Sequence, residues 1–227
     1  FSRDGRFAYI FGRDGGLTKV DLLRAEIAKR VIQSGNSIGG AISQDGKLIA
    51  VSNYKPGGVR VFDAETLKMV ADIPATMKDG TLSKVVGLVD APGQKFIFSL
   101  WDAGEIWVLD FSIGPEPGLT KFRNVGRNPY DALITSDGRY YVAGLFGEDG
   151  LAKLNLWNMD AGVTRILDGY GRGEACGAAV MRNSSDGAGV ANLCLLGSAV
   201  RQDGRSASLT APNGRAQQDL LRSAFAD

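Results

Sequence analysis

The sequence predicts an all-β fold, a β-propeller of about four blades. Four similar segments follow one another, each with a glycine-containing turn between two short apolar stretches. The turn glycines Gly5, Gly46, Gly93 and Gly138 recur at intervals of 41, 47 and 45 residues. A period of about 40–50 residues made of short strands and turns is typical of propeller blades. Because no window keeps a helical period of about 3.6 for three turns, we expect no long helix before Gly173.

The clearest blade is the fourth. Residues 130–135 form a short apolar run, and residues 136–139 are a tight turn of the Asp-Gly hairpin type. Residues 140–146 are rich in aromatic and β-branched side chains, as expected for a strand. Residues 151–155 alternate apolar and polar side chains, which indicates a half-buried strand.

The other three blades repeat this pattern at residues 2–21, 43–63 and 91–110. In the third blade, Pro92-Gly93 replaces the Asp-Gly turn. We expect four strands in each period, the innermost small and apolar where strands crowd the axis. In the third blade these strands are predicted at residues 84–89, 95–100, 106–109 and 120–125.

The composition changes after Gly173, which predicts two regions. Residues 1–173 form the blades, and residues 174–227 form an irregular tail rich in Ala, Gly and Ser. Such a composition buries too little apolar surface to offset the entropy of ordering the chain, so we expect most of the tail to be irregular or disordered. One strand at residues 190–196 and one short helix at residues 216–225 are the elements that the tail could contain.

Charge and residue usage exclude several function classes. Lys and Arg (26) nearly balance Asp and Glu (25), so there is no basic excess to attract nucleic acid. No apolar run approaches the roughly 18 residues of a transmembrane helix. Histidine is absent, which excludes a His-based triad and a His-ligated zinc or haem within this chain. Because the sequence starts at Phe1 rather than at a methionine, we expect it to be a piece of a longer protein.

Propeller topology predicts which loops share a face. Loops between the second and third strands, and loops that enter the next innermost strand, open on one face, while the Asp-Gly turns open on the other. The first face should therefore contain the loops at residues 12–15, 34–36, 53–56, 83–84, 101–103, 127–131 and 147–149.

Cations and aromatic residues come together in these loops. The cations predicted to converge there are Arg13, Lys55, Lys84 and Arg127, and the aromatic residues are Tyr54, Trp101 and Tyr130. Cations beside flat aromatic rings suit a large planar ligand that carries carboxylates. The alternative is that these residues are ordinary solvated surface and local packing.

Two carboxylates are best placed at the mouth of this face. Asp102 and Asp131 are candidates for acid–base chemistry, and a turn or capping role is the alternative for each. No metal site is predicted.

The sequence resembles the NirF family of haem d1 biosynthesis proteins of denitrifying bacteria. The resemblance lies in stretches such as FGRDGGLTKVDL, GNSIGGAISQDGKLIAVSNYKPGGVRVFD, GRNPYDALITSDGRYYVAGLFGEDG and ILDGYGRGE. It covers residues 1–174 nearly continuously, while the tail from Ala175 resembles no part of the family. The family is similar in turn to the haem d1 domain of cd1-type nitrite reductase, which is an eight-bladed propeller. The chain would then supply about four of eight blades, as an N-terminal fragment with an unrelated tail.

The resemblance implies a periplasmic protein that binds a d1-type tetrapyrrole, either haem d1 or its dihydro precursor. The implied activity is the dehydrogenation of a propionate side chain to an acrylate. The implied partners are other haem d1 maturation proteins and nitrite reductase.

The resemblance also implies roles for the residues singled out above. Arg13, in its Gly-Arg-Asp-Gly turn, matches an arginine that binds haem carboxylates in the nitrite reductase domain. Lys84 and Arg127 would complete a carboxylate clamp. Tyr54 and Tyr130 would stack on the macrocycle rim or donate hydrogen bonds to it.

The dehydrogenation that the resemblance implies would need a proton acceptor, for which Asp102 or Asp131 is the candidate by its place at the mouth of the face, with the tetrapyrrole iron taking up electrons. Two alternatives stay open. One is a non-catalytic carrier that holds the pigment and hands it on, and the other is a propeller that serves as an interaction scaffold.

Overall fold

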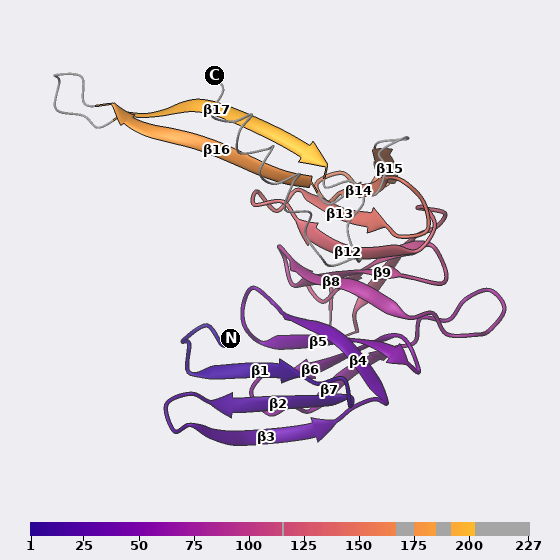
Figure 1. Ribbon diagram of the computed structural model, residues 1–227. Helices are drawn as coiled ribbons and strands as arrows, with labels where there is room; N and C mark the ends of the chain where they lie inside the picture. Colours follow the sequence, from indigo (N-terminus) through magenta and orange to yellow (C-terminus); the bar gives the residue numbers. More distant parts are fainter. Residues whose placement is uncertain (115, 167–174, 185–191, 203–227) are drawn as a thin grey trace. The chain divides into compact units, whose positions relative to one another are not determined.

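The computed structural model describes residues 1–114, 116–166, 175–184 and 192–202 (Figure 1). The chain divides into two compact units, Phe1–Tyr170 and Gly171–Asp227. The described part of the first unit consists of antiparallel sheets and loops, together with a single 3-10 turn, Met159–Ala161. This confirms the all-β propeller that the repeat predicts, including the absence of a long helix among the described residues.

The first unit contains four sheets that follow one another along the chain, here called blades 1 to 4. Blade 1 consists of β1 (Phe7–Phe11), β2 (Gly16–Asp21) and β3 (Glu26–Ile32). Blade 2 consists of β4 (Asn36–Ile42), β5 (Leu48–Lys55), β6 (Val59–Asp63) and β7 (Met69–Ile73).

Blades 3 and 4 have four strands each in the same order. Blade 3 consists of β8 (Val85–Ala91), β9 (Lys95–Leu100), β10 (Glu105–Asp110) and β11 (Gly118–Phe122). Blade 4 consists of β12 (Pro129–Ile134), β13 (Tyr140–Leu145), β14 (Leu151–Asn155) and β15 (Val163–Ile166).

Blade 1 departs from the expected four strands. Its first strand, β1, follows the turn that contains Gly5 and is therefore equivalent to the second strand of the other blades, such as β9. The three strands described in blade 1 are thus the second, third and outer strands of the repeat.

The turns that define the repeat share one backbone geometry. Gly5, Gly46, Gly93 and Gly138 have φ angles of 71°, 75°, 79° and 71°. In this left-handed region a side chain is disfavoured, so glycine is the residue that permits the turn. The third blade keeps the geometry although its sequence there is Pro-Gly, which explains why the period survives the change.

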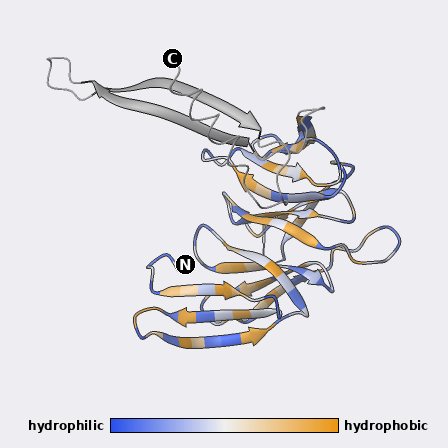
Figure 2. Cartoon of the chain, in the orientation of Figure 1, coloured by the Kyte–Doolittle hydropathy of each residue, from blue (hydrophilic) through white to orange (hydrophobic). Residues whose placement is uncertain are grey.

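The core lies between the blades. Alternate residues of each strand face the preceding and the following blade, so each blade contributes to two apolar layers. Phe96 and Phe98 of β9 pack toward blade 2, while Ile97 between them packs toward blade 4. Figure 2 shows hydrophobic colour concentrated on the strands and hydrophilic colour in most of the loops.

One buried polar contact links blades 3 and 4. The hydroxyl of Tyr141 donates to the backbone oxygen of Gly87 at 2.8 Å and lies 2.8 Å from the hydroxyl of Ser99. Tyr141 is fully buried, and burial raises the pKa of its phenol. Because a buried hydroxyl without partners would be costly, these contacts favour one relative placement of the two blades.

The second unit differs from the expectation for the tail. Its described residues form two antiparallel strands, β16 (Ala175–Ser184) and β17 (Asn192–Gln202). The strand expected at residues 190–196 overlaps β17, but its partner β16 was not expected, because a run rich in small residues carries little strand signal. The helix expected at residues 216–225 lies outside the described residues.

Candidate functional site

The loops that were predicted to share a face are joined by backbone contacts. Each loop entering an innermost strand is bonded to the loop between the second and third strands of that same blade. The N–H of Gly35 donates to the oxygen of Lys55, that of Trp101 to the oxygen of Lys84, and that of Gly147 to the oxygen of Arg127. We call this the site face, and the opposite face with the Asp-Gly turns the turn face.

An aromatic cluster lies on the site face where blades 3 and 4 meet. The ring centroids of Trp101 and Tyr130 are 5.0 Å apart, those of Trp101 and Phe146 are 4.8 Å apart, and those of Tyr130 and Phe146 are 5.8 Å apart. Asn128 fixes the spacing, because its side-chain amide donates to the backbone oxygen of Trp101. Phe146 was expected within a strand, but β13 ends at Leu145 and leaves Phe146 on the surface, 44% exposed.

Blade 2 contributes Tyr54 to the same region. The hydroxyls of Tyr54 and Tyr130, which are 76 residues apart in sequence, lie 3.4 Å from each other. Burial, together with the bond to Tyr130, raises the pKa of Tyr54 to about 12. The Tyr54 phenol is therefore protonated at neutral pH and can donate a hydrogen bond.

Arg13 extends this row into blade 1. Its guanidinium carbon lies 5.6 Å from the centre of the Tyr54 ring, and the side chain is exposed. Within the described residues, no carboxylate forms an ion pair with Arg13. The structure thus brings together Arg13, Tyr54 and Tyr130, in line with the grouping expected from the sequence.

Lys84 and Asp102 are bound to each other instead. The ammonium of Lys84 donates to one oxygen of Asp102 at 2.9 Å, and the backbone N–H of Lys84 donates to the other oxygen at 2.9 Å. The backbone N–H of Asp102 in turn donates to the Ser83 hydroxyl. Asp102 therefore ties two loops of blade 3 together, which is the structural role considered for it above.

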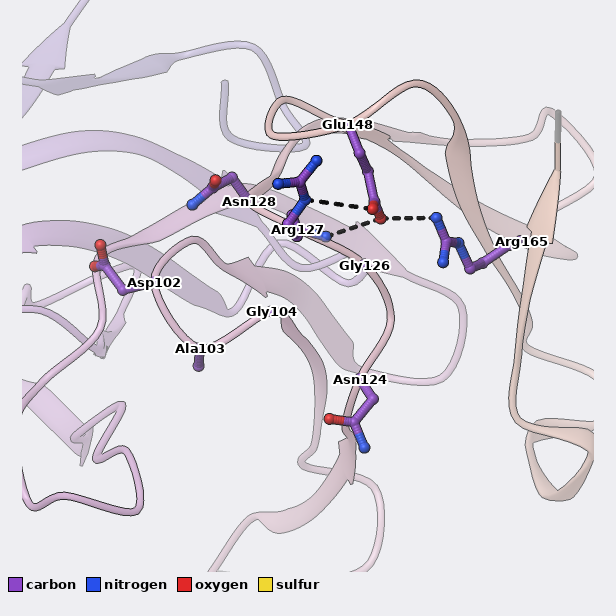
Figure 3. Close-up of a pocket in the computed structure, with 9 residues that line it drawn as sticks. All are labelled: Asp102, Ala103, Gly104, Asn124, Gly126, Arg127, Asn128, Glu148 and Arg165. Carbon is purple, nitrogen blue, oxygen red and sulfur yellow. Dashed lines mark hydrogen bonds and ion pairs between the residues drawn. The ribbon is translucent and has the colours of Figure 1, made fainter. Parts of the chain in front are cut away.

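Arg127 belongs to a second polar group (Figure 3). Glu148 accepts a hydrogen bond from the backbone N–H of Arg127 at 3.0 Å, and it forms ion pairs with Arg127 at 3.5 Å and with Arg165 at 2.9 Å. The backbone N–H and the two guanidinium groups hold the pKa of Glu148 below its usual range. Glu148 and Arg165 were not singled out from the sequence, since one lies in a turn and the other on an outer strand.

These residues line a cavity of about 470 Å³ at the junction of blades 3 and 4, here called the rim cavity. Its walls come from the loops of both blades and from β15. The lining residues are Asp102, Ala103, Gly104, Asn124, Gly126, Arg127, Asn128, Glu148 and Arg165.

Asp131 lies beside a smaller cavity of about 210 Å³, here called the axial cavity. This cavity lies between the innermost strands β4, β8 and β12, which contribute Gly39, Gly87 and Ala132 among others. Within the described residues, the carboxylate of Asp131 has no hydrogen bond or ion pair. Of the two candidate carboxylates, Asp131 is thus the one available to a ligand.

Gly87 allows these strands to approach closely. Its φ angle is 56°, and a Cβ atom built on it would lie 2.3 Å from the backbone oxygen of Tyr130. A side chain at this position would push β12 away from β8 and displace Tyr130.

No three metal-ligating side chains gather anywhere in the part of the chain that the structure describes. That part also contains no helix of the length and apolar character needed to cross a membrane.

The chain is a β-propeller whose site face carries aromatic and cationic side chains. A family model described as "Cytochrome D1 heme domain" matches residues 1–182. The chain belongs to this family.

Relatives and a solved structure support the same assignment. Protein NirF of Stutzerimonas stutzeri is 69% identical over 176 residues, which make up 77% of this chain and 45% of that protein. Dihydro-heme d1 dehydrogenase of Pseudomonas aeruginosa is 36% identical over 143 residues, which make up 63% of this chain and 29% of that protein. The resemblance to NirF expected from the sequence motifs is confirmed.

The solved structure of dihydro-heme d1 dehydrogenase NirN in complex with DHE is similar with a TM-score of 0.68 and 26% sequence identity. The match covers 89% of this chain and 43% of that one. The chain thus spans less than half the length of the curated relatives and of the solved structure that it matches.

Proposed function

We propose that this chain acts in haem d1 biosynthesis and forms part of a site for a d1-type tetrapyrrole, either haem d1 or its dihydro precursor. The observation that carries the proposal is the row formed by Arg13, Tyr54, Tyr130 and Trp101 across the blades of the site face. A macrocycle is large, flat and mostly apolar, with carboxylates at its edge. Aromatic rings supply the apolar contact, and Arg13 supplies a cation that no described carboxylate neutralises.

The proposed reaction is the oxidation of a propionate side chain to an acrylate. The –CH₂–CH₂– unit of the side chain loses two protons and two electrons and becomes –CH=CH–. Asp131 is our candidate for the group that accepts a proton, because its carboxylate has no partner among the described residues and lies beside the axial cavity. The two electrons must pass to an oxidant that meets the bound macrocycle.

A carrier that holds the pigment without changing it is the second candidate. The pairing of Asp102 with Lys84 favours this candidate. Because Asp102 is occupied, Asp131 is the one candidate base left available on the described site face. Because the family implies them, we also propose a periplasmic location and two kinds of partner. These partners are other haem d1 maturation proteins and nitrite reductase.

The test of binding is an absorbance titration of the purified chain with haem d1 and, separately, with its dihydro precursor. We expect a saturable spectral shift with at least one of them. Spectra equal to the sum of free ligand and free protein would contradict the proposal.

The test of chemistry is anaerobic incubation of the bound precursor with a chemical electron acceptor, followed by mass spectrometry for the loss of two hydrogens. Asp131→Asn should abolish turnover while binding stays within about threefold. Asp149→Asn changes an exposed carboxylate of the same face and is the matched control, which should keep turnover. Binding without turnover in the unmodified chain would favour the carrier.

A further inference from the structure

The rim cavity and the aromatic cluster share one loop. Asn128 lines the rim cavity, and its amide donates to the backbone oxygen of Trp101 in the cluster. Tyr130 follows two residues later and contacts Trp101 and Phe146. A flat ligand on the cluster would therefore have its edge toward the rim cavity.

The charges in the rim cavity do not balance internally. Arg127 and Arg165 share one carboxylate, that of Glu148, while the carboxylate of Asp102 is bound to Lys84. The side chain of Glu148 is 18% exposed, whereas those of Arg127 and Arg165 are 74% and 47% exposed. A guanidinium has five N–H donors, and within the described residues Glu148 occupies few of them, so both arginines keep donors that no described residue uses.

We infer that the rim cavity is a subsite for a peripheral carboxylate of the tetrapyrrole, with Arg165 of β15 as its second arginine beside Arg127. The inference rests on the proposed function and adds a residue and a place to it. Glu148 holds the two guanidinium groups on adjacent walls of the cavity (Figure 3), so a carboxylate entering it meets donors that are already oriented. Asn124 and Asn128 add neutral polar groups to the lining.

The exposure of the Arg165 side chain determines how much affinity its removal should cost. A charge-assisted hydrogen bond is strongest where solvent is excluded from it. Because Arg165 is about half exposed, solvent weakens the interaction, and we expect its loss to reduce affinity by about threefold to thirtyfold.

The experiment compares haem d1 with free carboxylates and haem d1 with methyl-esterified carboxylates, each titrated into the full chain. The variants are Arg165→Gln, Arg165→Lys and the control Arg123→Gln. Arg123 is the matched control for Arg165, because its side chain is similarly exposed (57% against 47%) and also pairs with a largely shielded carboxylate, that of Glu105, but it does not line the rim cavity. Thermal unfolding of each variant shows whether it is folded.

We expect Arg165→Gln to weaken binding of the free acid by about threefold to thirtyfold, Arg165→Lys to weaken it less, and Arg123→Gln to leave it unchanged. The ester should bind the unmodified chain more weakly and should not distinguish the variants.

If haem d1 binds the unmodified chain and both Arg165 variants equally, the subsite is wrong while the proposed function stands. If the unmodified chain does not bind haem d1, both fail. If Arg165→Gln does not fold, equal binding of acid and ester to the unmodified chain overturns the subsite.

Discussion

The two faces of the blade unit differ in how their loops are built. On the turn face, the same local side-chain contacts recur in three of the four blades. The hydroxyl of Ser43 donates to Asp45 and accepts the backbone N–H of Leu48. Blades 1 and 4 repeat both contacts within residues 2–7 and 135–140.

On the site face the side chains differ from blade to blade, and their contacts often cross between blades. Tyr54 of blade 2 meets Tyr130 of blade 4, and Asn128 of blade 4 bonds to Trp101 of blade 3. Arg13 of blade 1 lies over Tyr54. A residue that recurs in every blade serves the fold, whereas one that occurs in a single blade is free to serve a ligand. We therefore expect ligand contacts to come mainly from site-face residues that differ between blades.

The contrast is tested most strongly by removing one tryptophan from each face. Trp101→Ala should weaken tetrapyrrole binding by about tenfold to a hundredfold, since an aromatic side chain contributes about 1.5–3 kcal/mol when a ligand covers it. Trp157 is 67% exposed and lies on the turn face, because its neighbour Leu156 is bonded to Arg139 of the turn segment. Trp157→Ala should therefore leave binding unchanged. Absorbance titrations measure both. Equal losses of affinity in Trp101→Ala and Trp157→Ala would show that the ligand does not prefer the site face.

The converse substitution on the turn face should affect stability and not binding. Asp45 accepts hydrogen bonds from Ser43, from the backbone of Lys47 and from Gln94 of blade 3. Asp45→Ala should lower the free energy of unfolding by about 1–2 kcal/mol, because these donors lose their acceptor. Urea unfolding measures the change. A variant that is as stable as the parent but binds less tetrapyrrole would reverse the assignment of the two faces.

The turn carboxylates also predict a pH dependence. Hydrogen bonds from Ser2 and Thr135 lower the pKa of Asp4 and Asp137 below their usual 3.8. A lowered pKa in the folded state contributes stability above about pH 4, and this contribution is lost as the pH falls through the folded value. The melting temperature should therefore fall below about pH 4, and less steeply in Asp137→Asn. Parallel curves for parent and variant would exclude Asp137 as a contributor.

The smallest expected effect concerns the two phenols of the site face. Burial is the larger cause of the raised pKa of Tyr54, and the contact with Tyr130 is the smaller one. Tyr130→Phe should therefore move the titration of Tyr54 downward only modestly, as followed by tyrosinate absorbance at alkaline pH. An unchanged titration would mean that the contact between the hydroxyls is not formed in solution.

Repeating features could be predicted from the sequence because their signal is local. The strands expected at residues 95–100 and 151–155 coincide with β9 and β14, since alternation and a flanking turn define them. The shared face of the loops followed from propeller topology. The pairing of Tyr54 with Tyr130 depends on the rotation between blades, and no local pattern encodes it. Arg165 could not be found either, because an arginine on an outer strand looks like solvated surface.

The binding of the tetrapyrrole on the site face is tested most directly by NMR of the ¹⁵N-labelled chain with ferric haem d1. The paramagnetic iron broadens the signals of nearby amides, so the spectrum reports which face the macrocycle occupies. We expect broadening of the loops at residues 12–15, 53–56, 101–103 and 127–131, with sharp signals at residues 43–48 and 135–140 of the turn face. Broadening centred on the turn-face residues, or spread evenly over both faces, would contradict the account.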